Sequence, residues 1–236
     1  MKASLALSIL AIAGLAATAN AAQVTVSGGV SVPTMGTTGP LSANTNTALS
    51  FSGSGAGATV AGLVQATSTV GGDVQVLTLV LTNFSFTSTS ATAVVIDVTI
   101  VQDYHISDPG SFATGSHQLN GNSTGSRNGN IIVSSMHEST NLPVLNVAFI
   151  GADPNIGANQ GITTTVSPID TIYTITTTYR FTIEGGVGSG TIVLPDSGVD
   201  NATLVLVPIP QAAFAGIGGL ALAGLAVLRR RTQNHA

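Results

Sequence analysis

Residues 169–184 read IDTIYTITTTYRFTIE, and the alternation in this stretch decides the fold class. Polar residues fill most of the even positions, with Ile172 as the main exception. The odd positions carry the large apolar side chains Ile169, Tyr173, Ile175, Tyr179, Phe181 and Ile183. Because successive side chains of a strand point to opposite faces, this pattern predicts an antiparallel β-strand with one buried and one solvated face. A helix would scatter the same apolar residues around its whole circumference.

Strands are also predicted on both sides of this segment. Residues 73–89 and 91–106 are apolar on both faces for much of their length, and we expect them to form a hairpin, joined at STSAT (88–92), near the centre of a sheet. The Gly/Ser-rich stretches 52–57 and 185–190 and the polar segment 107–130 are predicted to be loops. Further strands are expected at 23–32, 58–69, 130–136, 144–150, 161–166, 190–194 and 202–207. We therefore predict an all-β fold: a single antiparallel β-sandwich, jelly-roll-like, over residues 22–206.

The composition supports this fold class and excludes several functions. Only 7% of the residues are charged, and a chain so poor in Lys and Glu favours strands over helices. There is no cysteine, which excludes disulfides, zinc ribbons and cysteine nucleophiles. Between residues 22 and 207 the positive side chains are Arg127 and Arg180 alone, and all 10 carboxylates lie there. An acidic middle of this kind argues against a nucleic-acid partner.

The N-terminal residues have the pattern of a secretory signal peptide. Lys2 precedes an apolar stretch from Leu5 to Ala17, and the sequence ATANAAQ follows, with small residues at A-x-A spacing. We predict a signal peptide over residues 1–21, cleaved after Ala21 with Ala19 and Ala21 as the small pair. Cleavage after Ala19 or Ala22 is the alternative. The chain is therefore expected to be exported.

Residues 207–231 read VPIPQAAFAGIGGLALAGLAVLRRR. The run from Ala212 to Leu228 has no charge and is near the shortest length that spans a bilayer, so we predict a transmembrane helix there. The arginines that follow it would stay in the cytoplasm, which leaves residues 22–207 outside. We expect the helix to anchor the chain in the membrane, either transiently or permanently. Anchoring is transient if a protease cuts before the helix, where the prolines keep the backbone extended, in a form that proteases bind.

This tail resembles the PEP-CTERM sorting signal of Gram-negative bacteria. In that family a Pro-Glu-Pro motif, a transmembrane helix and an arginine cluster are recognised by an exosortase. Here the corresponding residues form a VPxP variant with Ile in the place of Glu: Val207, Pro208, Ile209, Pro210, Arg229, Arg230 and Arg231. The resemblance is limited to residues 207–231. It implies a surface or matrix protein, often of organisms that make exopolysaccharide, with an exosortase-type enzyme as its processing partner.

A second sorting motif deserves comparison. Residues 194–198 read LPDSG and approximate the sortase pattern LPxTG. The strand-like segment NATLVLV separates them from the apolar run, whereas sortase substrates place the motif beside the helix. Pro-Asp-Ser-Gly is also typical of turns, so we predict a turn between two strands here.

The side chains that could bind a metal or act in catalysis are concentrated between Asp97 and Glu138. Asp103 and His105 would share one face of a strand, so a chelating pair is geometrically feasible. Neither HExxH nor an EF-hand pattern is present, and no GxSxG elbow offers a serine nucleophile. The alternative is that these residues hydrogen-bond to one another and to the backbone. The candidate ligands for Ca²⁺ or another divalent metal are Asp103, His105, Asp108, His117 and His137.

These features predict a non-enzymatic exported protein: a structural or adhesive component of the cell surface or extracellular matrix, associated with exopolysaccharide or biofilm. We assign no catalytic residue and expect no cofactor. One alternative is a carbohydrate-binding module, for which Tyr104, Tyr173 and Tyr179 would form a stacking platform unless they belong to the core. The other is a secreted metal-dependent enzyme that uses the Asp103–Glu138 cluster.

Overall fold

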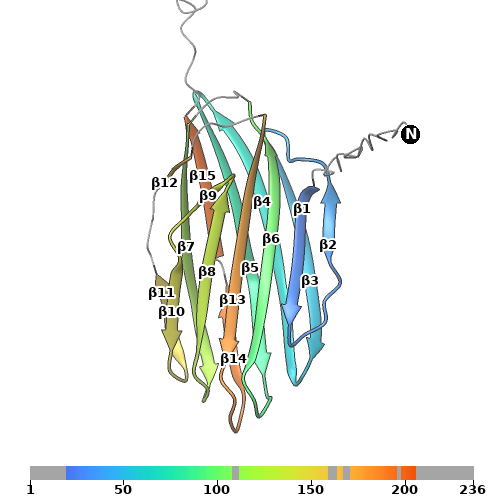
Figure 1. Ribbon diagram of the computed structural model, residues 1–236, viewed down its shortest axis with the longest axis vertical. Helices are drawn as coiled ribbons and strands as arrows, with labels where there is room; N and C mark the ends of the chain where they lie inside the picture. The colour runs from blue at the N-terminus through green and yellow to red at the C-terminus, as the bar shows by residue number, and fades with distance from the viewer. Residues whose placement is uncertain (1–19, 108–111, 159–163, 167–170, 196–197, 206–236) are drawn as a thin grey trace, which may run out of the picture.

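Every regular element that the computed structural model describes is a β-strand. The described residues are 20–107, 112–158, 164–166, 171–195 and 198–205. They form two antiparallel sheets that pack face to face (Figure 1). The predicted all-β sandwich is thus confirmed, and the chain passes repeatedly from one sheet to the other.

The first sheet, sheet I, has the strand order β10-β8-β13-β6-β1-β2, and β9 also pairs with β8. Its strands are β1 (Asn20–Gly28), β2 (Met35–Thr38), β6 (Val94–His105), β8 (Gly129–His137), β9 (Thr140–Asn141), β10 (Leu145–Phe149) and β13 (Ile172–Ile183).

The second sheet, sheet II, has the order β11-β7-β14-β5-β4-β3; β12 pairs with β7, and β15 lies between β5 and β7. Its strands are β3 (Thr45–Gly55), β4 (Ala58–Gly71), β5 (Val74–Ser88), β7 (Phe112–Gly125), β11 (Asp153–Ala158), β12 (Thr164–Val166), β14 (Gly190–Leu194) and β15 (Gly198–Val205).

Strand β13 confirms the alternation seen in the sequence. Tyr173, Ile175, Tyr179, Phe181 and Ile183 are each at most 1% exposed, whereas Thr174, Thr176, Thr178 and Thr182 face outward and are half-buried. The strand pairs with β6 and β8 along most of its length. The ring of Phe181 stacks on that of Phe84 in sheet II with centroids 4.2 Å apart. Burial of each such side chain stabilises the sandwich by about 1.5–3 kcal/mol.

The predicted hairpin between residues 73–89 and 91–106 is wrong. Strand β5 lies in sheet II and pairs with β4, β14 and β15, whereas β6 lies in sheet I. The connection STSAT crosses from one layer to the other. The two layers of a sandwich are only about 10 Å apart, so a short turn joins strands in different sheets as readily as neighbours in one sheet.

Two segments predicted as loops are strands. Residues 107–130 contain β7, whose inward positions include Ala113, Gly115 and His117, so no hydrophobic period marks it. Strand β3 runs through glycines of the predicted loop 52–57, and these glycines leave room for another part of the backbone, at Ser31, to lie close to the strand. A Cβ on Gly53 would lie 2.3 Å from the carbonyl oxygen of Ser31. Strands β2, β9 and β11 were also not anticipated.

Both ends of the described chain lie at the same end of the sandwich. β1 begins beside the end of β6, and Val205 at the end of β15 pairs with Val74 at the start of β5. A hydrogen bond joins the start of β5 to the end of β6: the side-chain amide of Gln75 donates to the carbonyl oxygen of His105 over 2.8 Å.

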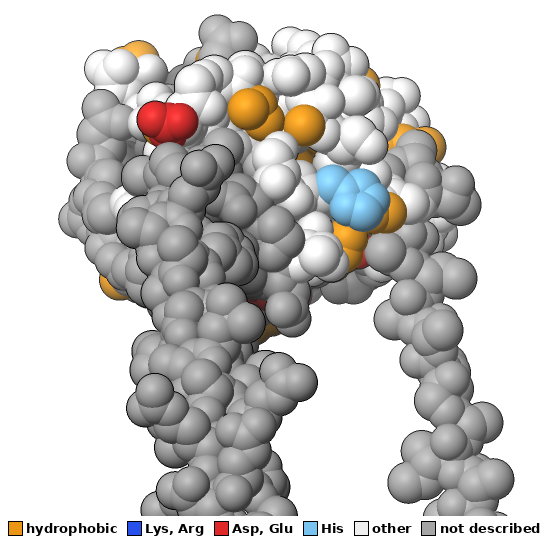
Figure 2. Space-filling model, turned by 90° about the horizontal axis from the view of Figure 1, so that it is seen from above, with side chains coloured by type: hydrophobic (Ala, Val, Ile, Leu, Met, Phe, Trp, Pro, Cys, Tyr) orange, Lys and Arg blue, Asp and Glu red, His pale blue; other side chains and the backbone are white. Residues whose placement is uncertain are grey.

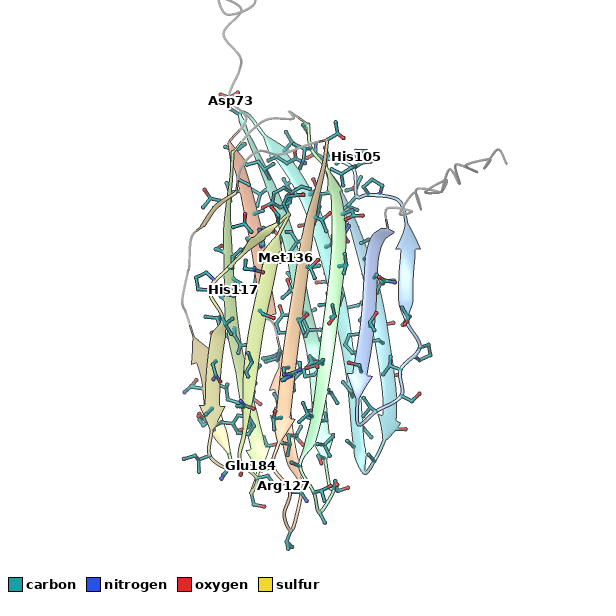
Figure 3. The ribbon with its side chains drawn as sticks, viewed as in Figure 1. Asp73, His105, His117, Arg127, Met136 and Glu184 are labelled. Carbon is teal, nitrogen blue, oxygen red and sulfur yellow. The ribbon has the colours of Figure 1, made fainter. Side chains whose placement is uncertain are left out.

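We call this end of the sandwich, marked by Asp73 and His105 in Figure 3, the proximal pole. The opposite end, marked by Arg127 and Glu184, is the distal pole. Most of the described side chains visible from the proximal side are uncharged, and one acidic group and one histidine are prominent among them (Figure 2). Residues 1–19 of the predicted signal peptide, the sorting motif and the transmembrane segment 212–228 lie outside the described residues. Within those residues no helix is long and apolar enough to cross a membrane.

Candidate functional site

The five candidate metal ligands are not brought together. Asp103 and His105 lie on the outer face of β6, where Asp103 accepts a hydrogen bond of 2.7 Å from the hydroxyl of Thr174. His117 and His137 are buried between the sheets, 2% and 0% exposed, and Asp108 lies outside the described residues. In the part of the chain that the structure describes, no three His, Asp or Glu side chains gather as metal ligands would.

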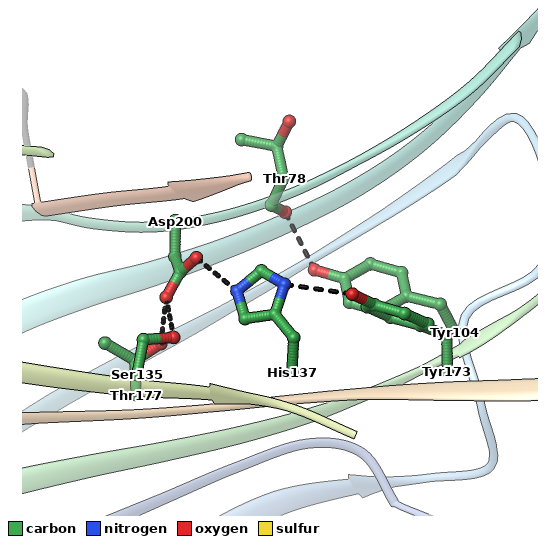
Figure 4. A network of polar contacts seen from close by, with 7 residues as sticks. All are labelled: Thr78, Tyr104, Ser135, His137, Tyr173, Thr177 and Asp200. Carbon is green, nitrogen blue, oxygen red and sulfur yellow. Dashed lines mark hydrogen bonds and ion pairs between the residues drawn. The ribbon is translucent and has the colours of Figure 1, made fainter. Parts of the chain in front are cut away.

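His137 instead belongs to a buried network centred on Asp200 (Figure 4). Its Nε2 lies 2.6 Å from Asp200 Oδ1, and both side chains are 0% exposed. Asp200 Oδ2 accepts hydrogen bonds from the hydroxyls of Ser135 and, over 2.7 Å, Thr177. Asp200 belongs to β15 of sheet II, and its three partners to β8 and β13 of sheet I. The network therefore joins the two sheets through side chains.

Two tyrosines extend the network along the core. The hydroxyl of Tyr173 lies 3.0 Å from His137 Nδ1, and that of Tyr104 donates to the Thr78 carbonyl oxygen across the sandwich over 2.9 Å. Burial, then the charge of Glu138 and of Asp200, raises the pKa of Tyr173, so its hydroxyl stays protonated over the ordinary pH range. The tautomer of His137 with its proton on Nε2 satisfies both contacts, because Tyr173 then donates to Nδ1 and Nε2–H donates to Asp200.

The network contains Ser, His and Asp, but its connections are not those of a hydrolase. The hydroxyl of Ser135 donates to the Asp200 carboxylate and not to the imidazole of His137, so the serine–histidine contact of a hydrolase triad is missing. Ser135 is 3% exposed, and His137 and Asp200 are 0% exposed, which leaves a substrate no access. Buried polar groups of this kind are stable because they satisfy one another, so the role of the cluster is structural.

His117 lies beside this network without joining it. On β7 it sits directly opposite Asp200 of β15, on the inner face of sheet II. Neither of its ring nitrogens makes a hydrogen bond of ordinary geometry within the described residues. Burial lowers the pKa of His117; the charge of Asp200 and the carbonyl of Pro143 oppose this shift without reversing it. His117 is therefore a buried histidine that resists protonation.

Arg127 forms a second buried polar centre, at the distal pole, and is 4% exposed. Its Nη1 donates to the carbonyl oxygen of Ser90 over 2.5 Å, and its Nη2 to those of Gly186 and Gly188, each over 2.6 Å. These carbonyls belong to the β5–β6 and β13–β14 connections, while Arg127 itself lies between β7 and β8. One guanidinium thus holds three turns together, and Val187, 96% exposed, projects between two of the bonded glycines.

The described surface offers no aromatic platform for a sugar. Tyr104, Tyr173 and Tyr179 belong to the core, each at most 1% exposed, as one of the two interpretations predicted. The phenylalanines whose exposure is described are also buried: Phe51, Phe84, Phe86, Phe149 and Phe181. A shallow groove beside β3 and β4 is lined by the polar residues Ser50, Ser52 and Asn83 and by apolar residues that include Pro33, Met35 and Leu63.

The sequence analysis missed Asp200, Ser135 and Thr177 as interacting residues. Each was marked by its phase, because each falls on the buried face of an alternating strand. Thr177 is in phase with Tyr173 and Phe181, and Asp200 with Ala202 and Leu204. A polar residue in a buried phase requires a partner in the opposite sheet, which is the signal that was available.

Comparison with known proteins adds little to this description. No protein-family model matches the sequence, and no curated protein matches it. Among solved structures, the carbohydrate-binding module TmCBM61 in complex with β-1,4-galactotriose is 10% identical, with a TM-score of 0.23, covering 61% of this chain and 86% of that one. The enzymatically active domain of bacteriophage CBA120 tailspike protein 4 is 12% identical, with a TM-score of 0.25, covering 61% of this chain and 19% of that one.

A third structure is the family 11 carbohydrate-binding module of the cellulosomal cellulase Lic26A-Cel5E of Clostridium thermocellum. It is 12% identical, with a TM-score of 0.17, covering 68% of this chain and 86% of that one. Similarities at this level carry no inference about function.

Proposed function

We propose that this chain is an exported cell-surface or extracellular-matrix protein with a structural or adhesive role, sorted by its C-terminal segment. A signal peptide delivers it, the segment 212–228 halts it in the membrane, and an exosortase-type enzyme processes it near Val207–Pro210. Polysaccharide is the expected contact in the matrix. The proposal rests first on the sorting features of the sequence at the two ends.

The position of the two chain ends supports this topology. Both ends of the sandwich lie at the proximal pole, and the Val-Pro-Ile-Pro motif starts two residues after β15 ends at Val205. A domain held by its C-terminus would therefore face the membrane with its proximal pole. The distal pole, with the turns that Arg127 fixes, would face outward.

The predicted signal cleavage is compatible with the fold. Cleavage after Ala21 removes only the first residues of β1, where Asn20 pairs with Thr38 of the short strand β2. The β1–β6 ladder begins at Gln23 and stays complete. Ala22, 0% exposed, would be the first residue of the mature chain.

The interior of the sandwich favours this role over an enzyme. Ser135, His137 and Asp200 are buried and bonded to one another, and the described residues have no gathered set of acidic or histidine ligands. A carbohydrate-binding module remains the second candidate, because uncharged hydroxyl and amide groups cover much of the surface. Binding of the exported chain to a glycan array would favour that module over a scaffold.

The test is intact-mass spectrometry of the full-length chain after expression in a Gram-negative host with and without an exosortase. We expect a mature chain that starts at Ala22 in both strains and lacks the C-terminal segment only where exosortase is present. Substitution of Arg229, Arg230 and Arg231 by Gln should block C-terminal processing, whereas R180Q, which removes an exposed arginine of the sandwich, should not. Recovery of a soluble periplasmic chain with its C-terminus intact in both strains would contradict the proposal.

A further inference from the structure

The groove beside β3 and β4 lies on the outer face of sheet II and extends from β3 across β4 to β5. Its volume, about 470 Å³, is in the range of small-molecule binding sites. The connection from β1 to β2 closes the groove beyond β3, because Pro33 and Met35 also line it. Neighbouring strands of a sheet lie about 4.8 Å apart, so about 10 Å separates Asn83 on β5 from Ser50 and Ser52 on β3. The groove is therefore long enough for a short oligosaccharide.

A β-bulge places Asn83 in this groove. The register between β4 and β5 shifts at Gly62, which stands opposite two residues of β5, Asn83 and Phe84. Asn83 has a φ of 48°, in the left-handed region that residues other than glycine rarely adopt. Its backbone N–H donates to the carbonyl oxygen of Pro195 over 3.2 Å, which holds the irregular backbone in place. Bulges and strained residues of this kind recur at functional sites, where they re-aim a side chain.

The polar groups of the groove are available to a ligand. Asn83, Ser50 and Ser52 are exposed, and their side chains make no hydrogen bond to any other residue that the structure describes. The amide of Asn83 offers two donors and an acceptor, and each serine hydroxyl donates and accepts. A purely apolar ligand would displace water from these groups without replacing its hydrogen bonds, which is costly.

The rest of the lining is mainly aliphatic and carries no charge. Pro33 is exposed, and Met35 and Leu63 are half-buried. None of the described residues that line the groove is charged, so no group there attracts a phosphate, a carboxylate or a cation. A sugar ring matches both parts of this lining, because it has an apolar C–H face and hydroxyl groups around its rim.

We propose that the groove binds a neutral sugar unit of an extracellular polysaccharide. The C–H face of the ring packs on the aliphatic side chains, and its hydroxyls exchange hydrogen bonds with Asn83, Ser50 and Ser52. This inference rests on the proposed function, in which polysaccharide is the contact of the exported chain, and it names the residues that make that contact.

The position of the groove suits a long polymer. Asn83 lies nearer to Ser88, at the distal end of β5, than to Val74 at the proximal pole. The groove therefore opens on the side of the sandwich, away from the pole that would face the membrane. A polysaccharide reaches it from the matrix without passing between the domain and the lipid.

The test is affinity electrophoresis of the purified full-length chain in gels that contain dextran, mixed-linkage β-glucan, galactan or alginate. The chain is produced in the host without an exosortase and kept in a detergent that has no sugar head group. We expect at least one of the neutral polymers (dextran, β-glucan and galactan) to retard the chain, and the acidic alginate not to. Retardation by none of the neutral polymers, or by alginate alone, would overturn the inference.

Two variants test the polar side of the groove. N83G removes the amide while keeping the positive φ of the bulge, which glycine adopts without strain. S50A/S52A removes both hydroxyls. Each should raise the Kd for the retarding polysaccharide by about five- to tenfold, because hydrogen bonds to the sugar are lost. Equal retardation of wild type, N83G and S50A/S52A would place the binding elsewhere and overturn the inference.

The matched control is N44G. Asn44 also has a positive φ, 57°, but it does not line the groove. Its Oδ1 accepts a hydrogen bond of 2.8 Å from the Val70 N–H. N44G should therefore lower the urea midpoint and leave the Kd unchanged, whereas N83G should change the Kd. An equal rise of the Kd in both variants would show a general effect on the fold and contradict a site at Asn83.

The outcomes also separate this inference from the proposed function. A chain that is processed at both ends as proposed but is not retarded by any neutral polymer refutes the groove alone. A chain whose retardation depends on Asn83, but which keeps its C-terminus in the presence of an exosortase, refutes the proposed sorting alone.

Discussion

The two buried polar centres of the sandwich are built from different bonds. Among the described residues, the carboxylate of Asp200 is hydrogen-bonded only to the side chains of His137, Ser135 and Thr177, all in the opposite sheet. Within the same part of the chain, the guanidinium of Arg127 is hydrogen-bonded only to backbone carbonyls, in two turns of the distal pole. The first arrangement holds the layers together, whereas the second fixes the shape of turns between strands that are already paired. Equal burial of two charged residue types therefore does not imply equal roles.

The largest effect is expected from D200A. The substitution leaves His137 Nε2 buried without its partner and the hydroxyls of Ser135 and Thr177 with only each other, 3.4 Å apart, and the loss of one member of such a cluster costs about 3–5 kcal/mol. Urea denaturation should show a markedly lower midpoint. D200N is the matched control, since its amide oxygen still accepts a hydrogen bond from a hydroxyl, and it should retain part of the lost stability. A D200A midpoint equal to that of wild type would show that the network does not join the sheets.

R127M should have a smaller and more local effect. Methionine keeps much of the apolar volume but loses the bonds to Ser90, Gly186 and Gly188, at a cost of about 2 kcal/mol. The expected measurement is increased proteolytic cleavage in the turns 89–93 and 184–189 with β13 and β15 still protected. R127K retains a charge but not the planar fork that reaches both turns, so it should resemble R127M. Full protection of both turns in R127M would contradict the role of Arg127.

Neighbouring threonines of β13 give a matched pair that sharpens the comparison. Thr177 is 0% exposed and donates to Asp200, whereas Thr178 faces outward and shares a 3.1 Å contact with the hydroxyl of Thr99. T177V should cost about 1–2 kcal/mol, because it removes one donor from Asp200 without changing volume. T178V should leave the urea midpoint nearly unchanged, since valine suits a half-exposed strand position. Equal effects of the two substitutions would remove the distinction between the faces.

The smallest effect at pH 7 is expected from H117L. Burial holds the pKa of His117 below its ordinary value of 6.5, so at lower pH the unfolded chain binds a proton that the folded chain does not. Wild-type stability should therefore fall as the pH drops below about 6.5, by at most about 1.4 kcal/mol per pH unit from this group. In H117L this component disappears, and the urea midpoint should depend less steeply on pH between 7.5 and 5.5. H105Q, which removes an exposed histidine, is the control. An unchanged pH dependence in H117L would contradict the assignment.

The sequence predicted the fold wherever one face of a strand was apolar. Strand β13 followed from hydrophobic alternation, β5 and β6 followed from segments that are apolar on both faces, and most of β4 and β8 was also predicted. The LPDSG segment connects β14 to β15. Strand β7 was not predicted, because Gly115 and His117 occupy inward positions that carry no hydrophobic signal. Strand β3 was not predicted, because its glycines were interpreted as a loop. In the structure they allow another segment of the backbone to lie close to the strand.

The candidate site was predictable only in part. The sequence identified His137 as a residue of interest, but its partner Asp200 is 63 positions away and in the other sheet. Pairing between sheets depends on strand order, and no local pattern determines strand order. The metal hypothesis grouped residues by their proximity in sequence, whereas the alternation of β6 places Asp103 and His105 outside the core that holds His117 and His137.

Hydrogen–deuterium exchange on D200A and R127M, measured side by side by mass spectrometry, tests the central claim that Asp200 joins the sheets while Arg127 fixes turns. We expect D200A to accelerate exchange in β8, β13 and β15 together, because these strands would lose their shared connection. In R127M, faster exchange should be confined to the turns 89–93, 126–128 and 184–189. The opposite result, with the D200A effect limited to β15 and the R127M effect spread through β13, would contradict the account.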